Sequence, residues 1–289
     1  MKLAVHRTLL AAFALAAAAS ATSTARAAPA PTPALSGITA PGGFLLSPTR
    51  IVLGGVQRTA QLTLVNNGAE LAVYRLTLIR MRMAEDGRLE EIATPDSGES
   101  FADTLVRFSP RQVELEPSAA QTVRFQLRAP ADLPPGEYRS HLLIRAVPRT
   151  LATPPRDSSA NGVTIQLTPI YGAAIPVIVR QGATEATVAV EHPVLVAGTA
   201  HQPTRVACAL TRTGTRSVYG DVVVTLEPSS GKKRQIGRVN GVAVYTPNRL
   251  RRIEVPVALP VARVGQGRIE VRFEESGHGP VASAAIALD

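Results

Sequence analysis

The sequence predicts an all-β protein built of β-sandwich domains. Short runs of alternating apolar and polar residues, rich in Val, Ile, Leu and Thr, recur along the chain and indicate half-buried strands. Residues typical of turns separate these runs about every 8–12 positions, as in β-sandwiches. No long stretch after the N-terminus keeps the 3.6-residue period of a helix. At 289 residues, the chain is long enough for about two domains.

Residues 1–27 are predicted to be a cleaved secretory signal peptide. Lys2 and Arg7 form a basic head, residues 9–19 are apolar and uncharged, and Ala25-Arg26-Ala27 fits a small-x-small cleavage site. A soluble N-terminal helix is the alternative interpretation. No later stretch approaches about 18 uncharged apolar residues, so no transmembrane segment is expected.

Composition and charge exclude several classes of site. The single cysteine, Cys208, rules out a disulfide within the chain, and it is expected to be a small buried side chain. The 5 histidines lack ligand spacing, so no metal and no cofactor are predicted. The formal net charge is +9, but the arginines are dispersed and the one basic cluster, residues 232–234, fits a hairpin loop. We therefore expect no nucleic-acid partner.

The first sandwich is predicted to span residues 44–182, after a Pro- and Ala-rich leader at 28–43. Alternation predicts its strands at 51–53, 60–65, 71–83, 113–115, 123–127 and 138–147. Asp86-Gly87 is a strong hairpin signal, and Glu116-Pro117-Ser118 fits another turn. Residues 148–162 are expected to be a mobile loop, followed by a last strand at 163–180.

The second sandwich is predicted to span residues 183–289, after a hinge at Gln181-Gly182. The same alternation predicts its strands at 187–190, 204–210, 221–226, 236–239, 250–259, 267–273 and 281–288. Tyr219 and Tyr245 are expected to be core or rim aromatic residues rather than a platform for a ligand.

Four stretches of the first domain carry a resemblance to a known family. They are Ser47-Pro48-Thr49-Arg50-Ile51-Val52-Leu53, Leu62-Thr63-Leu64-Val65-Asn66-Asn67, residues 108–117 and residues 138–148. In order and spacing, they resemble the PapD-like periplasmic chaperones of the chaperone–usher pilus pathway, with Ser118 where that family usually has Gly. The resemblance implies two immunoglobulin-like domains in tandem, in a boomerang-like arrangement.

The resemblance also implies a mechanism of binding. Chaperones of this family lend a strand to pilus subunits that lack one, so that alternate apolar side chains fill the subunit's exposed core. Val163, Ile165 and Leu167 match these donor positions in type and spacing. The alternative interpretation is that the three side chains face the core of their own domain.

Arg50 matches the arginine that, in the family, binds the subunit's C-terminal carboxylate between the two domains. A guanidinium suits this role because its fork can donate to both carboxylate oxygens. The alternative is an ordinary surface arginine. The family pairs this arginine with a lysine, but the corresponding position here is Pro176 or Gly172, depending on the alignment. Because Pro176 lacks an amide hydrogen, it is expected at a strand edge or a bulge.

These observations predict an exported chaperone of the periplasm in a Gram-negative envelope. Its expected partners are exported pilin-like subunits, with an outer-membrane usher and a self-capping dimer as further candidates. The alternative is a structural or adhesive exported protein of tandem immunoglobulin-like domains. No enzymatic activity is expected, because the chain lacks Gly-x-Ser-x-Gly and His-Glu-x-x-His motifs and supplies no paired carboxylates on one face.

Overall fold

A computed structural model describes residues 38–40, 43–148, 171–259 and 266–288. The predicted signal peptide, most of the leader and nearly all of the predicted loop lie outside these residues, and so do Val163, Ile165 and Leu167. The described residues form strands and turns and contain no helix. Among them, there is accordingly no helix long and apolar enough to cross a membrane. Residues Ser36–Asp289 belong to one compact unit.

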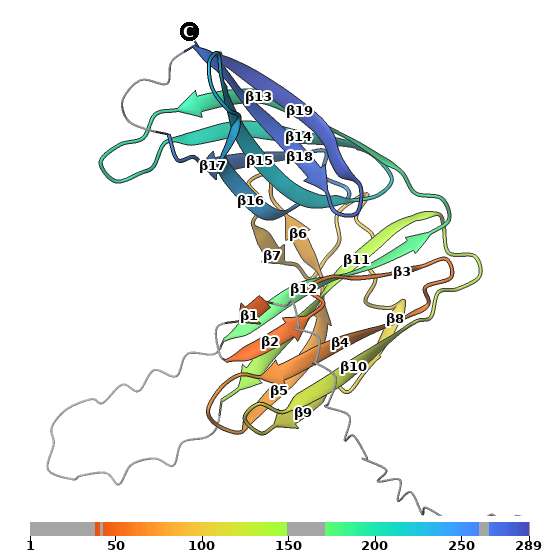
Figure 1. The fold of residues 1–289 in the computed structure, drawn as a ribbon. Helices are drawn as coiled ribbons and strands as arrows, with labels where there is room; N and C mark the ends of the chain where they lie inside the picture. Colours follow the sequence, from red (N-terminus) through yellow and green to blue (C-terminus); the bar gives the residue numbers. More distant parts are fainter. Residues whose placement is uncertain (1–37, 41–42, 149–170, 260–265, 289) are drawn as a thin grey trace, which may run out of the picture. The chain divides into compact units, whose positions relative to one another are not determined.

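The first sandwich consists of two five-stranded sheets (Figure 1). One sheet has the order β1 (Ile38–Ala40), β2 (Phe44–Ser47), β4 (Thr59–Asn66), β10 (Ala120–Leu127) and β8 (Val106–Ser109). The other has the order β3 (Ile51–Gly54), β12 (Gly172–Gln181), β11 (Gly136–Val147), β5 (Ala72–Ile79) and β9 (Gln112–Leu115). Alternation along β5 illustrates how the sequence builds this core. Tyr74 and Leu76 are buried, whereas Arg75 and Thr77 are exposed.

The second sandwich has its own hydrophobic core between a three-stranded and a four-stranded sheet. The three-stranded sheet has the order β13 (Ala186–Val196), β14 (Arg205–Gly214) and β17 (Leu250–Pro256). The four-stranded sheet has the order β16 (Arg234–Val244), β15 (Val218–Pro228), β18 (Gly267–Glu275) and β19 (Gly279–Leu288). The predicted all-β class with two sandwiches is therefore confirmed, while the boundary near residue 182 stays a prediction.

Several predicted elements differ from the observed ones. The strand expected at 71–83 is divided into β5 and β6 (Met81–Met83), and β6 forms a hairpin with β7 (Leu89–Glu91) around the predicted Asp86-Gly87 turn. The strand expected at 250–259 ends at Pro256. Short strands β2 and β8 were not predicted.

Pro176 lies in β12 at a point where the strand is paired on one side only, which fits the expectation for a proline. β12 is flanked by β11 on one side and by β3 on the other. The pairing with β3 begins only at Val177, which lies opposite Ile51. Pro176 therefore stands just outside the stretch where β12 has neighbours on both sides, and a missing amide hydrogen is tolerated there.

Ser118 occupies a backbone conformation that favours glycine. Its φ angle is 64°, and its amide donates a 2.8 Å hydrogen bond to the carbonyl of Asn66. Side chains with a Cβ pay about 1–2 kcal/mol in this left-handed region, although a serine loses less chain entropy on folding than a glycine. The residue thus stores modest strain in the turn between β9 and β10.

We expect Ser118→Gly to stabilise the first sandwich by up to about 1 kcal/mol, because glycine adopts this φ angle without strain. Thermal unfolding should show an increase of about 2–4 °C in its melting temperature. Ser118→Ala is the matched control, since alanine keeps the strained Cβ and should give no increase. An equal effect of both substitutions would contradict the strain.

Candidate functional site

Arg50 directly precedes β3, on the edge of the sheet that contains β12. Its guanidinium carbon lies 4.7 Å from the ring centroid of Tyr219 and 5.7 Å from that of Tyr245. Its Nη1 is buried and has no hydrogen-bond partner among the residues that the structure describes. The structure thus places the predicted arginine against two aromatic rings of the second sandwich, with a donor left free for a ligand.

A second guanidinium, which sequence reasoning missed, lies on the same tyrosine. Arg139 projects from β11, is only 4% exposed, and lies 4.3 Å from the ring centroid of Tyr245. Its Nε is buried without a hydrogen-bond partner. Burial lowers the pKa of Arg139 because the charged form is desolvated, and the positive charge of Arg50 adds to this effect.

Sheet register brings the two arginines to one face. Val52 pairs with Ile178, and Ile178 pairs with Arg139, so these three residues form a row across β3, β12 and β11. Since alternate residues of a strand share a face, Arg50 lies on the same face as Val52. Spacing along the sequence could not reveal this row, because the three strands are far apart in the chain.

Tyr245 is held beneath the guanidiniums by a small apolar cluster. Its buried neighbours in this cluster are Met83, Ile178 and Ala243, with Tyr219 packed against it. Tyr219 and Tyr245 were expected to be core or rim aromatic residues. They do pack in this cluster, but their rings also support Arg50, so the expectation covered only part of their role.

His141 completes the buried face below Arg139. It is fully buried, its ring contacts Tyr245 edge to face at 5.9 Å, and its Nδ1 lies 3.4 Å from Nη1 of Arg139. Desolvation, with the charges of Arg139 and Arg50, lowers the pKa of His141 to about 3. The imidazole is therefore neutral at ordinary pH and leaves the positive charge to the arginines.

Glu137 joins the first sandwich to the second. Its buried carboxylate accepts hydrogen bonds from Nε of Arg180 (3.0 Å), from the amide of Ser217 (3.1 Å) and from the Ser217 hydroxyl. Nearby, Arg216 donates to both carboxylate oxygens of Glu275 at 2.5 and 3.3 Å. Arg180 and Arg216 are thus both neutralised by carboxylates.

A pocket of about 500 Å³ opens beside these residues. Its lining includes Arg50, Arg180, Arg216 and Tyr219. Among these three arginines, Arg50 is the one with a buried N–H that lacks a partner, because the other two face Glu137 and Glu275. Chemically, the site is suited to a small anionic group such as a carboxylate, which a guanidinium fork can bind through two oxygens.

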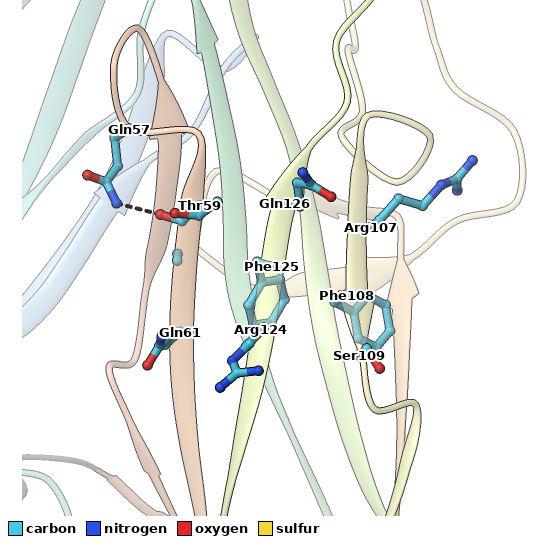
Figure 2. Close-up of a pocket in the computed structure, with 10 residues that line it drawn as sticks. Gln57, Thr59, Gln61, Arg107, Phe108, Ser109, Arg124, Phe125 and Gln126 are labelled. Carbon is cyan, nitrogen blue, oxygen red and sulfur yellow. Dashed lines mark hydrogen bonds between the residues drawn. The ribbon is translucent and has the colours of Figure 1, made fainter.

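Another pocket, of about 660 Å³, lies on β4, β8 and β10 (Figure 2). Phe108 and Phe125 lie in it with Arg107 and Arg124, and Gln57 donates to the carbonyl of Thr59 at its rim. None of the predicted site residues lines this pocket. Cys208 is buried as expected, and desolvation raises the pKa of its thiol to about 11.

Comparison with known proteins finds likenesses of fold. No family model matches the chain, and no curated protein matches it. The YadV chaperone is 14% identical, with a TM-score of 0.44, over 85% of this chain and 100% of that chain. The CsuC–CsuE chaperone–tip adhesion subunit pre-assembly complex of Acinetobacter baumannii is 12% identical, with a TM-score of 0.42, over 84% and 97%. The Pseudomonas aeruginosa CupB2 chaperone is 14% identical, with a TM-score of 0.40, over 84% and 100%.

These solved structures are chaperones, the class of protein that the sequence resembles.

We expect the free energy of unfolding to fall as the pH drops from 6.5 toward 3. Unfolded His141 binds a proton below about pH 6.5, whereas folded His141 stays neutral down to about pH 3. Protonation of His141 in the unfolded chain should lower the free energy of unfolding by about 1 kcal/mol between pH 7 and pH 5.5. Denaturant unfolding of wild type and His141→Gln at several pH values measures this, and the free energy of unfolding of the variant should change less steeply with pH.

His201→Gln, at an exposed position, is the control and should keep the pH dependence of wild type. The same pH dependence in His141→Gln as in wild type would contradict the assignment.

Glu137→Gln should lower the free energy of unfolding by about 2–3 kcal/mol, because it removes the charge that pairs with Arg180 and Ser217. Denaturant unfolding at neutral pH measures the loss. Glu114→Gln makes the same change at an exposed position on β9 and should stay within about 0.5 kcal/mol of wild type. Similar losses in both variants would mean that Glu137 does not couple the two sandwiches.

Proposed function

We propose that this chain is an exported chaperone that binds pilin-like subunits in the periplasm. In this proposal, Arg50 receives the C-terminal carboxylate of a subunit, and the segment with Val163, Ile165 and Leu167 adds a strand to the subunit's incomplete sandwich. The observation that carries the proposal is the buried Nη1 of Arg50, which has no partner among the described residues, beside a pocket lined by Arg50, Arg180, Arg216 and Glu275.

The chemistry of Arg50 supports a carboxylate as its ligand. A buried N–H without a partner carries a desolvation penalty, and a bound carboxylate would remove that penalty with charge-assisted hydrogen bonds. The ring faces of Tyr219 and Tyr245 fix the guanidinium, so little side-chain freedom is lost on binding. An ordinary surface arginine has neither the rings nor the buried donor.

The sheet next to Arg50 supports strand addition. β12 continues the chain from the segment of Val163, Ile165 and Leu167, and β12 pairs in parallel with β3, which starts directly after Arg50. A client strand that follows this segment would be guided toward the carboxylate site. Backbone hydrogen bonds would then provide affinity, and pockets for alternate side chains would provide specificity. Each buried apolar side chain would contribute roughly 1.5–3 kcal/mol.

The alternative, a structural or adhesive exported protein, would need neither a free buried donor at Arg50 nor an anion pocket. Tandem sandwiches alone are compatible with both functions. The site around Arg50 is the feature that favours the chaperone, with an outer-membrane usher as a further candidate partner.

Co-purification from a periplasmic extract tests the proposal. Wild type and Ile165→Asp are compared, with bound proteins identified by mass spectrometry. We expect a small exported β-protein on wild type and at least a tenfold loss with Ile165→Asp, because a charge is costly to bury in a client core. Thr164→Asp places the same charge one residue away, on the opposite face of an extended strand, and should retain more of the client.

Arg50→Ala separates the anchor from the strand, and it should weaken the complex while the protein stays folded. A client retained equally by Ile165→Asp and wild type would refute strand donation through this segment. The absence of any client would bring the structural-protein alternative to the front.

A further inference from the structure

Two guanidiniums at the proposed site have N–H groups without partners. Nη1 of Arg50 and Nε of Arg139 are both buried and unpaired, and both side chains lie against the ring of Tyr245. Buried donors are nearly always satisfied in native proteins, so two on one tyrosine call for an explanation.

The acidic residues that act on Arg139 are already engaged elsewhere. Glu137 and Glu99 are the carboxylates whose charges favour its protonated form. Glu137 is bound to Arg180 and Ser217, and Glu99 receives two hydrogen bonds from Arg82, at 2.7 and 2.8 Å. Neither carboxylate is hydrogen-bonded to Arg139 among the described residues. The positive charge of Arg139 therefore has no direct counterion in the part of the chain that the structure describes.

The register between β11 and β12 places Arg139 next to Pro176. On β12, Pro176 pairs with His141 of β11, and Ile178 pairs with Arg139. Arg139 is thus the diagonal cross-strand neighbour of Pro176, and such diagonal positions lie within reach of a long side chain. The resemblance put the family's lysine at Pro176 or at Gly172, and Arg139 is a cation beside the first of these positions.

We infer that Arg139 is the second cation of the anchor, a positioning residue that fixes Tyr245 and Arg50 and adds positive charge for a bound carboxylate. The inference rests on the proposed function and deepens it, because it places a second positive charge behind the carboxylate site. It also explains why an uncompensated cation is kept in the interior, where an apolar residue would cost less free energy.

A purely structural role for Arg139 and the inferred role predict different effects of its removal on the melting temperature. Removal of an arginine that holds the fold together would lower the melting temperature. Removal of a buried cation without a counterion should leave the melting temperature unchanged or raise it, while binding of an anion suffers. Stability and binding should therefore move in different directions in Arg139→Met.

The test uses a small carboxylate, so that it does not depend on finding the client. The full exported chain, labelled with ¹⁵N-arginine, is titrated with N-acetylglycine, and the Nε–Hε signals of Arg50 and Arg139 are followed by NMR. N-acetylglycinamide is the uncharged control ligand. We expect saturable shifts with the acid and none with the amide.

Three variants decide the outcome. Arg139→Met should bind N-acetylglycine about tenfold more weakly than wild type, and Arg139→Lys should recover most of the affinity because it keeps the charge. Arg124→Met, at an exposed position on β10, should bind as wild type. Thermal unfolding of each variant gives the second readout.

Wild-type affinity in Arg139→Met would overturn the inference and leave the anchor at Arg50 intact. An unfolded or strongly destabilised Arg139→Met would also overturn it, in favour of a structural role. No saturable shift in wild type would overturn the inference and remove the carboxylate anchor from the proposed function, while strand donation would still be judged separately by Ile165→Asp.

Discussion

The buried carboxylate of Glu137 is the constraint on which the site depends. It is fully buried, and it receives hydrogen bonds from Arg180 of its own sandwich and from Ser217 of the second one. Because Glu137 is committed to these donors, it is unavailable to Arg139 on the same strand. In the same way, Glu275 is bound to Arg216 and so neutralises that arginine. Among the described arginines of this region, Arg180 and Arg216 are thus paired with carboxylates, whereas Arg50 and Arg139 are not.

The buried arginines without carboxylate partners reduce the stability of the fold. A cation in the interior without a counterion lowers stability, and natural cores usually exclude it. Here the rings of Tyr219 and Tyr245 recover part of that free energy through cation–π contacts. His141 adds no competing charge, since burial beside two arginines keeps it neutral. The guanidiniums and rings are thus held in place by the fold itself, and the rest of each sandwich supplies the stability that tolerates them.

Much of the fold could be predicted from the sequence, and less of the site. Period-2 alternation is a local signal, so strands such as β4, β10 and β11 were predicted to within a few residues. Arg50 was singled out by its resemblance to the family's arginine, and the structure places it against Tyr219 and Tyr245, while its role stays a prediction. Arg139 was not, because its role follows from the pairing of β11 with β12, which no local pattern encodes. The left-handed φ angle of Ser118 was likewise hidden, although its occupation of a usual glycine position was a hint.

The two tyrosines under the arginines have a consequence for spectroscopy. The chain contains no tryptophan and 5 tyrosines, so tyrosine dominates its near-ultraviolet absorption and emission. Two of these rings, Tyr219 and Tyr245, are the ones in contact with Arg50. The protein therefore carries an intrinsic chromophore at the place where a ligand would bind, and its own optical signal reports on that site without any attached label.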